Sequence, residues 1–81
     1  MKEMYILGYE RCLNGEKERY VLGSAYTYEN VKSMFDVATA GFVAVKSDDY
    51  FYEAEKDYLK ISKSKDNYIK YFITQEMWMF E

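Results

Sequence analysis

The Asn14-Gly15 dipeptide, set between two runs of strand-forming residues, is the feature that most constrains the fold of this chain. Both central positions of a type I′ turn need a positive φ angle, which asparagine and glycine adopt readily. With these two residues as the loop, Glu10 lies opposite Arg19 and Tyr9 lies opposite Tyr20. A slip of one residue would separate both pairs, so the sequence predicts a β-hairpin with a fixed register.

The same register makes predictions farther from the turn. The other expected pairs are Arg11 with Glu18, Gly8 with Val21, Leu7 with Leu22, and Ile6 with Gly23. Glycines in a strand leave shallow positions on its surface. We expect a helix to pack closely against one face of the hairpin and cover both Gly8 and Gly23.

A helix is predicted over about residues 28–40. Thr27 is a suitable N-cap, and Glu29 would lie in the first turn, where the helix dipole favours an anion. Gly41 is expected to end the helix, because glycine adopts the left-handed conformation that follows many helices. Apolar residues recur at helical spacing through this segment: Val31, Met34, Phe35, Ala38 and Phe42.

The rest of the chain predicts strands. Residues 42–45 form a short apolar run typical of a strand. Residues 50–62 fit either a helical stripe or strand alternation, and their tyrosines and phenylalanine favour strands. A polar turn at 62–67 precedes an alternating terminal strand. The sequence therefore predicts one α+β domain over residues 1–81: an N-terminal β-hairpin, one helix, a strand and a C-terminal β-meander, in a mostly antiparallel sheet with the helix packed on it.

Catalytic groups are scarce. The chain has no histidine and one cysteine, so Cys12 has no imidazole base to activate it, and a structural zinc site of the usual type cannot form. We predict an ordinary, half-exposed strand cysteine. The carboxylates between residues 48 and 55 belong to a run of charge, for which a solvated face is the default. The sequence predicts no enzyme, no catalytic residue, no metal site and no cofactor.

Aromatic residues, in contrast, are in excess: ten tyrosines, five phenylalanines and one tryptophan among 81 residues. This favours a protein that functions by contact. The acidic and aromatic run at 48–55 suits a basic, nucleic-acid-binding surface on another protein, with carboxylates in the place of phosphates. The alternative is a strand with a buried aromatic face and a solvated acidic face. The predicted partner-binding residues are Asp48, Asp49, Tyr50, Tyr52, Glu53 and Glu55.

Residues 56–70 offer an alternative site, because they carry five lysines against two aspartates. Lysines interspersed with tyrosines can follow a single nucleic-acid strand by charge and stacking. The acidic segment beside them makes direct nucleic-acid binding the weaker prediction, and a solvated hairpin rim would explain the same residues. The residues of this alternative site are Lys56, Tyr58, Lys60, Lys63, Lys65 and Tyr68.

Two further predictions concern self-association and location. A small-ligand-binding domain, or an oligomeric enzyme with an aromatic pocket between subunits, is the second alternative function. The apolar segment Met77-Trp78-Met79-Phe80 would be costly to expose, which favours a homodimer through the C-terminal strand. The chain shows neither a signal-peptide pattern nor an apolar run long enough for a membrane span, so we expect no membrane partner and a location in the cytoplasm of a bacterial host.

By analogy of size and composition, the chain looks like small accessory proteins of bacteriophages and mobile elements. Many of these are compact acidic domains without catalytic residues that inhibit host defence systems by binding them, as anti-CRISPR and anti-restriction proteins do. The analogy implies a host protein as the partner. The leading functional prediction is therefore a non-enzymatic protein-binding domain that inhibits such a protein.

Overall fold

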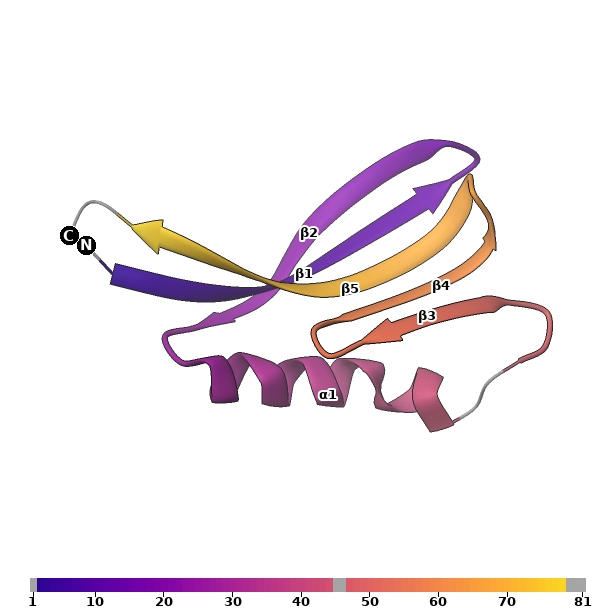
Figure 1. Cartoon of the computed structure of the whole chain (residues 1–81). Helices are drawn as coiled ribbons and strands as arrows, with labels where there is room; N and C mark the ends of the chain where they lie inside the picture. The colour runs from indigo at the N-terminus through magenta and orange to yellow at the C-terminus, as the bar shows by residue number, and fades with distance from the viewer. Residues whose placement is uncertain (1, 45–46, 79–81) are drawn as a thin grey trace.

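The computed structural model describes residues 2–44 and 47–78. Its elements are β1 (Lys2–Leu13), β2 (Glu16–Ala25), α1 (Tyr28–Ala44), β3 (Phe51–Glu55), β4 (Tyr58–Ser64) and β5 (Asn67–Trp78). The strands form one antiparallel sheet in the order β2-β1-β5-β4-β3, and α1 lies along one face of it (Figure 1). The predicted α+β class is confirmed, with its N-terminal hairpin and its C-terminal meander.

The hairpin turn has the predicted backbone conformation. Asn14 has a φ angle of 53° and Gly15 one of 85°, as a type I′ turn requires. The register near the turn is also confirmed, from Arg11 opposite Glu18 to Gly8 opposite Val21. The turn therefore sets the pairing of the first several residues of each strand.

Beyond Gly8 the predicted register is wrong, because a β-bulge lies between Leu7 and Gly8. Leu7 pairs with Gly23 instead of Leu22, and Ile6 pairs with Ser24. The bulge allows Gly23 to lie directly beneath α1, where an added Cβ atom would come within 2.9 Å of the Met34 sulfur. The register with the bulge thus places a residue without a side chain where the helix approaches closely.

The two glycines lie on opposite faces of the sheet, which corrects the prediction that one helix covers both. Gly23 is covered by α1, as expected. Gly8 lies on the other face beneath the ring of Phe72, with the nearest ring atoms 2.5 and 2.6 Å from the position of an added Cβ atom. The predicted helix contact is therefore confirmed for Gly23 and wrong for Gly8.

The helix begins as predicted and ends later. The Thr27 hydroxyl accepts a hydrogen bond from the Asn30 amide at 3.3 Å, so Thr27 is the N-cap. The helix continues through Gly41 to Ala44, so the predicted strand at 42–45 is wrong for residues 42–44, and Val45 lies outside the described residues. The Phe42 ring packs against the Tyr71 ring, with 5.9 Å between the ring centres. This contact offsets the cost of about 1 kcal/mol for a glycine inside a helix.

The core lies between α1 and the sheet. Its buried residues come from β1, α1 and β4: Leu7, Val31, Phe35, Leu59 and Ile61. Pairs of tyrosine rings extend this core. The centres of the Tyr5 and Tyr28 rings are 6.0 Å apart, and those of the Tyr9 and Tyr71 rings are 5.0 Å apart. Some of the many aromatic residues therefore contribute to packing within the domain.

The C-terminal half follows the strand interpretation of residues 50–62, because β3 and β4 lie there. β5 then inserts between β1 and β4 and pairs with β1 over nearly its whole length, from Tyr68 opposite Cys12 to Trp78 opposite Lys2. Over residues 74–78, β5 has β1 on one side and no described strand on the other. A homodimer through this strand remains a prediction, and Met79 and Phe80 lie outside the described residues.

Candidate functional site

The sheet has a second face, opposite α1, that no described helix covers (Figure 1). Successive side chains of a strand point to opposite faces of the sheet. The residues on either side of a core residue therefore point to this open face. The sheet register aligns them in rows across the strands: Tyr58, Phe72 and Gly8 in one, Lys60, Lys70, Glu10 and Arg19 in the next, and Ser62, Tyr68 and Cys12 in the third. The open face therefore gathers cations and aromatic rings around a central carboxylate, with Glu53 and Glu55 of β3 at its border.

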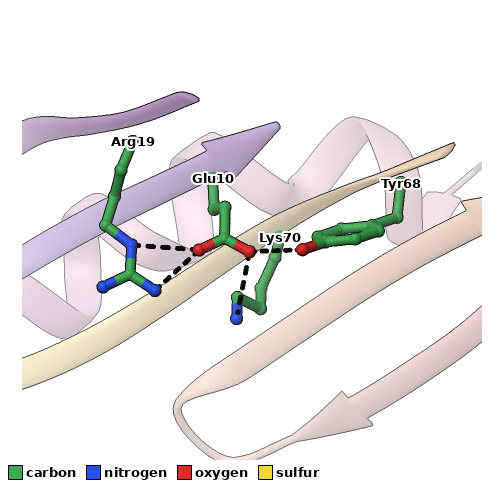
Figure 2. Close-up of polar contacts among 4 residues, drawn as sticks. All are labelled: Glu10, Arg19, Tyr68 and Lys70. Atoms are coloured by element: carbon green, nitrogen blue, oxygen red, sulfur yellow. Dashed lines mark hydrogen bonds and ion pairs between the residues drawn. The ribbon is translucent and has the colours of Figure 1, made fainter. Parts of the chain in front are cut away.

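Glu10 is that carboxylate, and it is only 4% exposed. Its Oε1 atom accepts hydrogen bonds from Arg19, at 3.0 Å from Nε and 2.6 Å from Nη2. Its Oε2 atom accepts one from the Tyr68 hydroxyl at 2.5 Å and lies 3.5 Å from the Lys70 ammonium nitrogen (Figure 2). A buried carboxylate is stable only with such partners, because burial alone would favour its neutral form.

The surroundings of Glu10 lower its pKa to about 2. The largest cause is the hydrogen bond from Tyr68, and Arg19 and Lys70 act in the same direction against the opposing effect of burial. The same hydrogen bond and burial raise the pKa of Tyr68 to about 12. At neutral pH the Glu10 carboxylate is therefore ionised and the Tyr68 phenol is neutral, and the two groups are hydrogen-bonded to each other. This pair is suited to holding side chains in place and poorly suited to transferring protons.

The cations of the open face also lie over aromatic rings. The Lys60 nitrogen is 4.4 Å from the centre of the Tyr68 ring. Arg19 and Lys70 each lie 5.5 Å from the centre of the Phe72 ring. Contacts of this kind contribute about 0.5–1 kcal/mol each at exposed sites, and they fix the positions of long side chains that would otherwise be mobile.

Cys12 belongs to the same face and is buried, with 3% of its surface exposed. Its thiol donates a hydrogen bond to the backbone oxygen of Asp66 at 3.3 Å. The prediction of a half-exposed cysteine is therefore wrong. The turn between β4 and β5 folds over the tip of the hairpin, where the Gly15 amide also donates to the Asp66 oxygen at 3.1 Å, and that contact buries the thiol.

The predicted partner-binding residues lie along the outer strand β3 and the turn before it, which we call the β3 edge (residues 48–55). Tyr50 is 44% exposed and Phe51 70% exposed, and the carboxylates of this segment are also exposed. Tyr52 departs from the prediction: it packs against the core, and its hydroxyl accepts a hydrogen bond from the Ser47 amide at 3.0 Å. Strand alternation thus leaves Phe51 in place of Tyr52 as the outward aromatic residue.

The structure divides the residues of the alternative lysine site. Tyr58, Lys60 and Tyr68 come together on the open face. Lys56 lies in the turn between β3 and β4, with its nitrogen 5.3 Å from the centre of the Tyr28 ring, at the helix. Lys63 and Lys65 are exposed near the turn between β4 and β5. Sequence reasoning missed Arg19 and Phe72, and it counted Lys70 in the basic segment without including it among the site residues; all three join this face through the pairing of β1 with β5 and β2.

A prediction follows from the contact between Gly8 and Phe72. Gly8→Ala is expected to lower the free energy of unfolding by about 1–3 kcal/mol, because the new methyl group overlaps the ring. Phe72→Leu should relieve part of that overlap, so the double variant should be more stable than the two single effects predict. Urea unfolding of the four proteins measures this coupling, and strictly additive effects would show that the ring does not press on position 8.

Open hollows lie on the surface, one on the open face and one beside the helix. One, of about 390 Å³, lies on the open face beside Phe72 and is lined in part by Gly8, Arg19 and Thr74. Another, of about 490 Å³, lies between β2 and α1 and is lined mainly by aliphatic side chains, among them Leu22, Met34 and Val37. The predicted aromatic ligand pocket between subunits remains a prediction.

Within residues 2–44 and 47–78, histidine, cysteine and acidic side chains form no group of three that could hold a metal ion. In the same part of the chain, no helix combines the length and apolar character needed to cross a membrane. Comparison of the chain with protein-family models, curated proteins and solved structures finds no match.

Proposed function

We propose that this protein is a non-enzymatic protein-binding domain that engages its partner through the β3 edge. The observation that carries the proposal is an outer strand with a highly exposed phenylalanine, Phe51, set among exposed carboxylates and without a described neighbour on its outer side. Proteins protect such edges with short strands, charged side chains (lysine above all), proline or a covering segment, and β3 is short and carries Glu53 and Glu55. Its charges are acidic and it contains neither lysine nor proline, so the edge would repel acidic strands and remain open to a basic one.

The chemistry of the β3 edge defines the partner. An extended segment of another protein can add to the outer side of β3, beyond which no described strand lies. Glu53 lies opposite Lys60 and Glu55 opposite Tyr58, so both carboxylates point to the open face, where lysine or arginine of an added strand would meet them. Phe51 and Tyr50 supply apolar contact area. A basic strand or basic surface is therefore the complementary partner.

The finer form of this proposal is inhibition. A host protein that binds nucleic acid carries a basic surface of this kind, and the carboxylates of the β3 edge would compete there with phosphates. Occupation of that surface would inhibit the host protein without any chemical step. This is the mode of action that we propose, with a defence protein of a bacterial host as the class of target.

Affinity capture from a bacterial lysate treated with nuclease tests the proposal. We expect one protein to be enriched by the wild-type chain and to be lost with Phe51→Ser, because burial of a phenylalanine contributes about 1.5–3 kcal/mol. Alanine at Asp48, Asp49, Glu53 and Glu55 together should weaken capture and make it less sensitive to salt. These side chains make no core contact, so the fold should be retained.

Val37→Ser is the matched control, because Val37 is an apolar residue of α1 with 79% of its surface exposed. It should capture the same protein as the wild type. If Phe51→Ser and the alanine variant also capture that protein undiminished, the β3 edge is not the interface. Recovery of the bait alone would count against a protein partner in that lysate.

A further inference from the structure

We propose that the open face of the sheet is a second binding surface, and that it binds single-stranded nucleic acid. The cations contact phosphates, and the aromatic rings stack on bases. This inference uses other residues than the proposed function, although Phe51, Glu53 and Glu55 of the β3 edge border the same face. The residues that form the surface are Arg19, Tyr58, Lys60, Tyr68, Lys70 and Phe72.

The sheet places cations and rings in alternation. Along β5, Tyr68, Lys70 and Phe72 point to the open face one after another, about 7 Å apart. Across β4, Tyr58 pairs with Phe72 and Lys60 pairs with Lys70. Rings and cations therefore form a two-dimensional pattern over neighbouring strands. Tyr58, Tyr68 and Phe72 are each partly exposed, and sheet surfaces that present two or three aromatic rings to solvent are suited to stacking successive unpaired bases.

The charge on this face is directed outward. The carboxylate of Glu10 lies beneath the cations, with 5% of its side chain exposed, whereas the Arg19 side chain is 68% exposed. Glu10 receives two of the N–H groups of Arg19, and a guanidinium carries five. The remaining donors are available to an anion, and the hydrogen bonds to Glu10 hold the guanidinium in place before it binds. Binding to such a site costs less side-chain entropy.

The surroundings of the open face favour a single strand over a duplex. Glu53 and Glu55 border the face on β3, so the cationic area is a strip that acidic residues limit on that side. A duplex needs a broad basic surface, and its bases are already stacked and paired. A single strand can follow the strip and present its bases to Tyr58, Tyr68 and Phe72.

Fluorescence anisotropy with a labelled oligothymidylate or oligouridylate of about 12 nucleotides tests the inference, a length within the usual site size of single-strand binders. We expect a dissociation constant of about 1–100 µM at physiological salt. The logarithm of the affinity should fall with the logarithm of salt concentration with a slope of about −2, as three phosphate contacts predict. The duplex of the same length should bind more weakly.

Two variants locate the site. Lys60→Gln should weaken binding about fivefold or more and reduce the salt slope by about 0.7, since one phosphate contact is removed. Lys65→Gln removes the same charge from the turn between β4 and β5 and should change affinity less than about twofold. Phe72→Leu keeps an apolar side chain over Gly8 and removes the stacking surface, so binding should weaken about tenfold.

Several results would overturn the inference. One is an equal loss of affinity with Lys60→Gln and Lys65→Gln. Another is a duplex or polyglutamate that binds as tightly as the single strand. A third is the absence of any anisotropy change at about 1 mM protein, a concentration above the weakest dissociation constants of non-specific binding. Alanine at both Asp48 and Asp49 should not weaken oligonucleotide binding, because these residues lie in the turn before β3 and outside the rows of the open face. The behaviour of this variant separates a failure on the open face from a failure of the proposed protein interface.

Discussion

Glu10→Gln is expected to lower the free energy of unfolding at pH 7 by about 3 kcal/mol, which for a domain of this size lowers Tm by about 10 °C or more. In the folded protein the pKa of Glu10 is about 2, compared with an ordinary value of 4.5. A depressed pKa means that the ionised carboxylate is stabilised in the folded state relative to the unfolded state. Glutamine keeps the shape of the side chain and removes the charge that Arg19, Tyr68 and Lys70 contact.

The sign of the shift sets the pH dependence. The contribution of Glu10 is complete above about pH 5 and declines as the pH falls from 4.5 towards 2, where the folded protein also takes up the proton. The two proteins should therefore differ most at neutral pH and approach equal stability near pH 2. The raised pKa of Tyr68 comes from the same hydrogen bond, so the two shifts are one contribution. Above pH 10 the unfolded state ionises first, and stability should fall again.

Urea unfolding of both proteins from pH 7 to pH 2 measures the effect. Glu18→Gln is the matched control, because Glu18 also forms an ion pair, with Arg11 at 2.8 Å, but its side chain is about half exposed. Exposed pairs contribute little, so that variant should behave like the wild type. A deficit of Glu10→Gln that persists unchanged to pH 2 would show that the charge is not its source.

Phe35→Ala is expected to have the largest effect on stability, a loss of about 3–5 kcal/mol. Phe35 is 5% exposed and lies in the core cluster with Val31 and Leu7. Its removal leaves a cavity between α1 and the centre of the sheet, because a small domain has few other side chains to fill the space. It also removes the ring beneath the Lys32 ammonium, whose nitrogen lies 4.5 Å from the ring centre.

Thermal and urea unfolding of Phe35→Ala should show a large loss of stability or, at 37 °C, an unfolded chain. Val37→Ala, two residues along the same helix, tests whether a change in α1 alone has this effect, since Val37 is mostly exposed. It should leave stability nearly unchanged. A small loss with Phe35→Ala would contradict a core centred on this helix face.

Local signals in the sequence predict local structure well. The Asn14-Gly15 turn predicts its own φ angles and the pairs from Arg11 to Gly8, and Thr27 predicts the start of the helix. The bulge at Leu7 could not be predicted from the hairpin alone, because it places Gly23 against Met34 of a helix that follows later in the chain. The predicted end of the helix at Gly41 is also wrong because of a contact distant in the chain. Phe42 is part of the helix and packs against Tyr71 of β5.

The candidate sites differ in how far the sequence reveals them. The β3 edge is one continuous segment, so its residues are visible as a run, and only strand alternation decides that Phe51 faces outward while Tyr52 packs inward. The open face joins Glu10 to Tyr68 and Lys70, which are far away along the chain. That contact depends on β5 lying beside β1, a pairing for which the sequence carries no turn or spacing signal.

Amide hydrogen exchange of the chain, free and bound to the captured partner, tests the central claim most directly. Among residues 2–44 and 47–78, no strand lies on the outer side of β3. We expect exchange at 51–55 to slow markedly in the complex, while exchange along the outer edge of β2 stays as in the free protein. Protection that appears on β2 or α1, with none at 51–55, would contradict binding through the β3 edge.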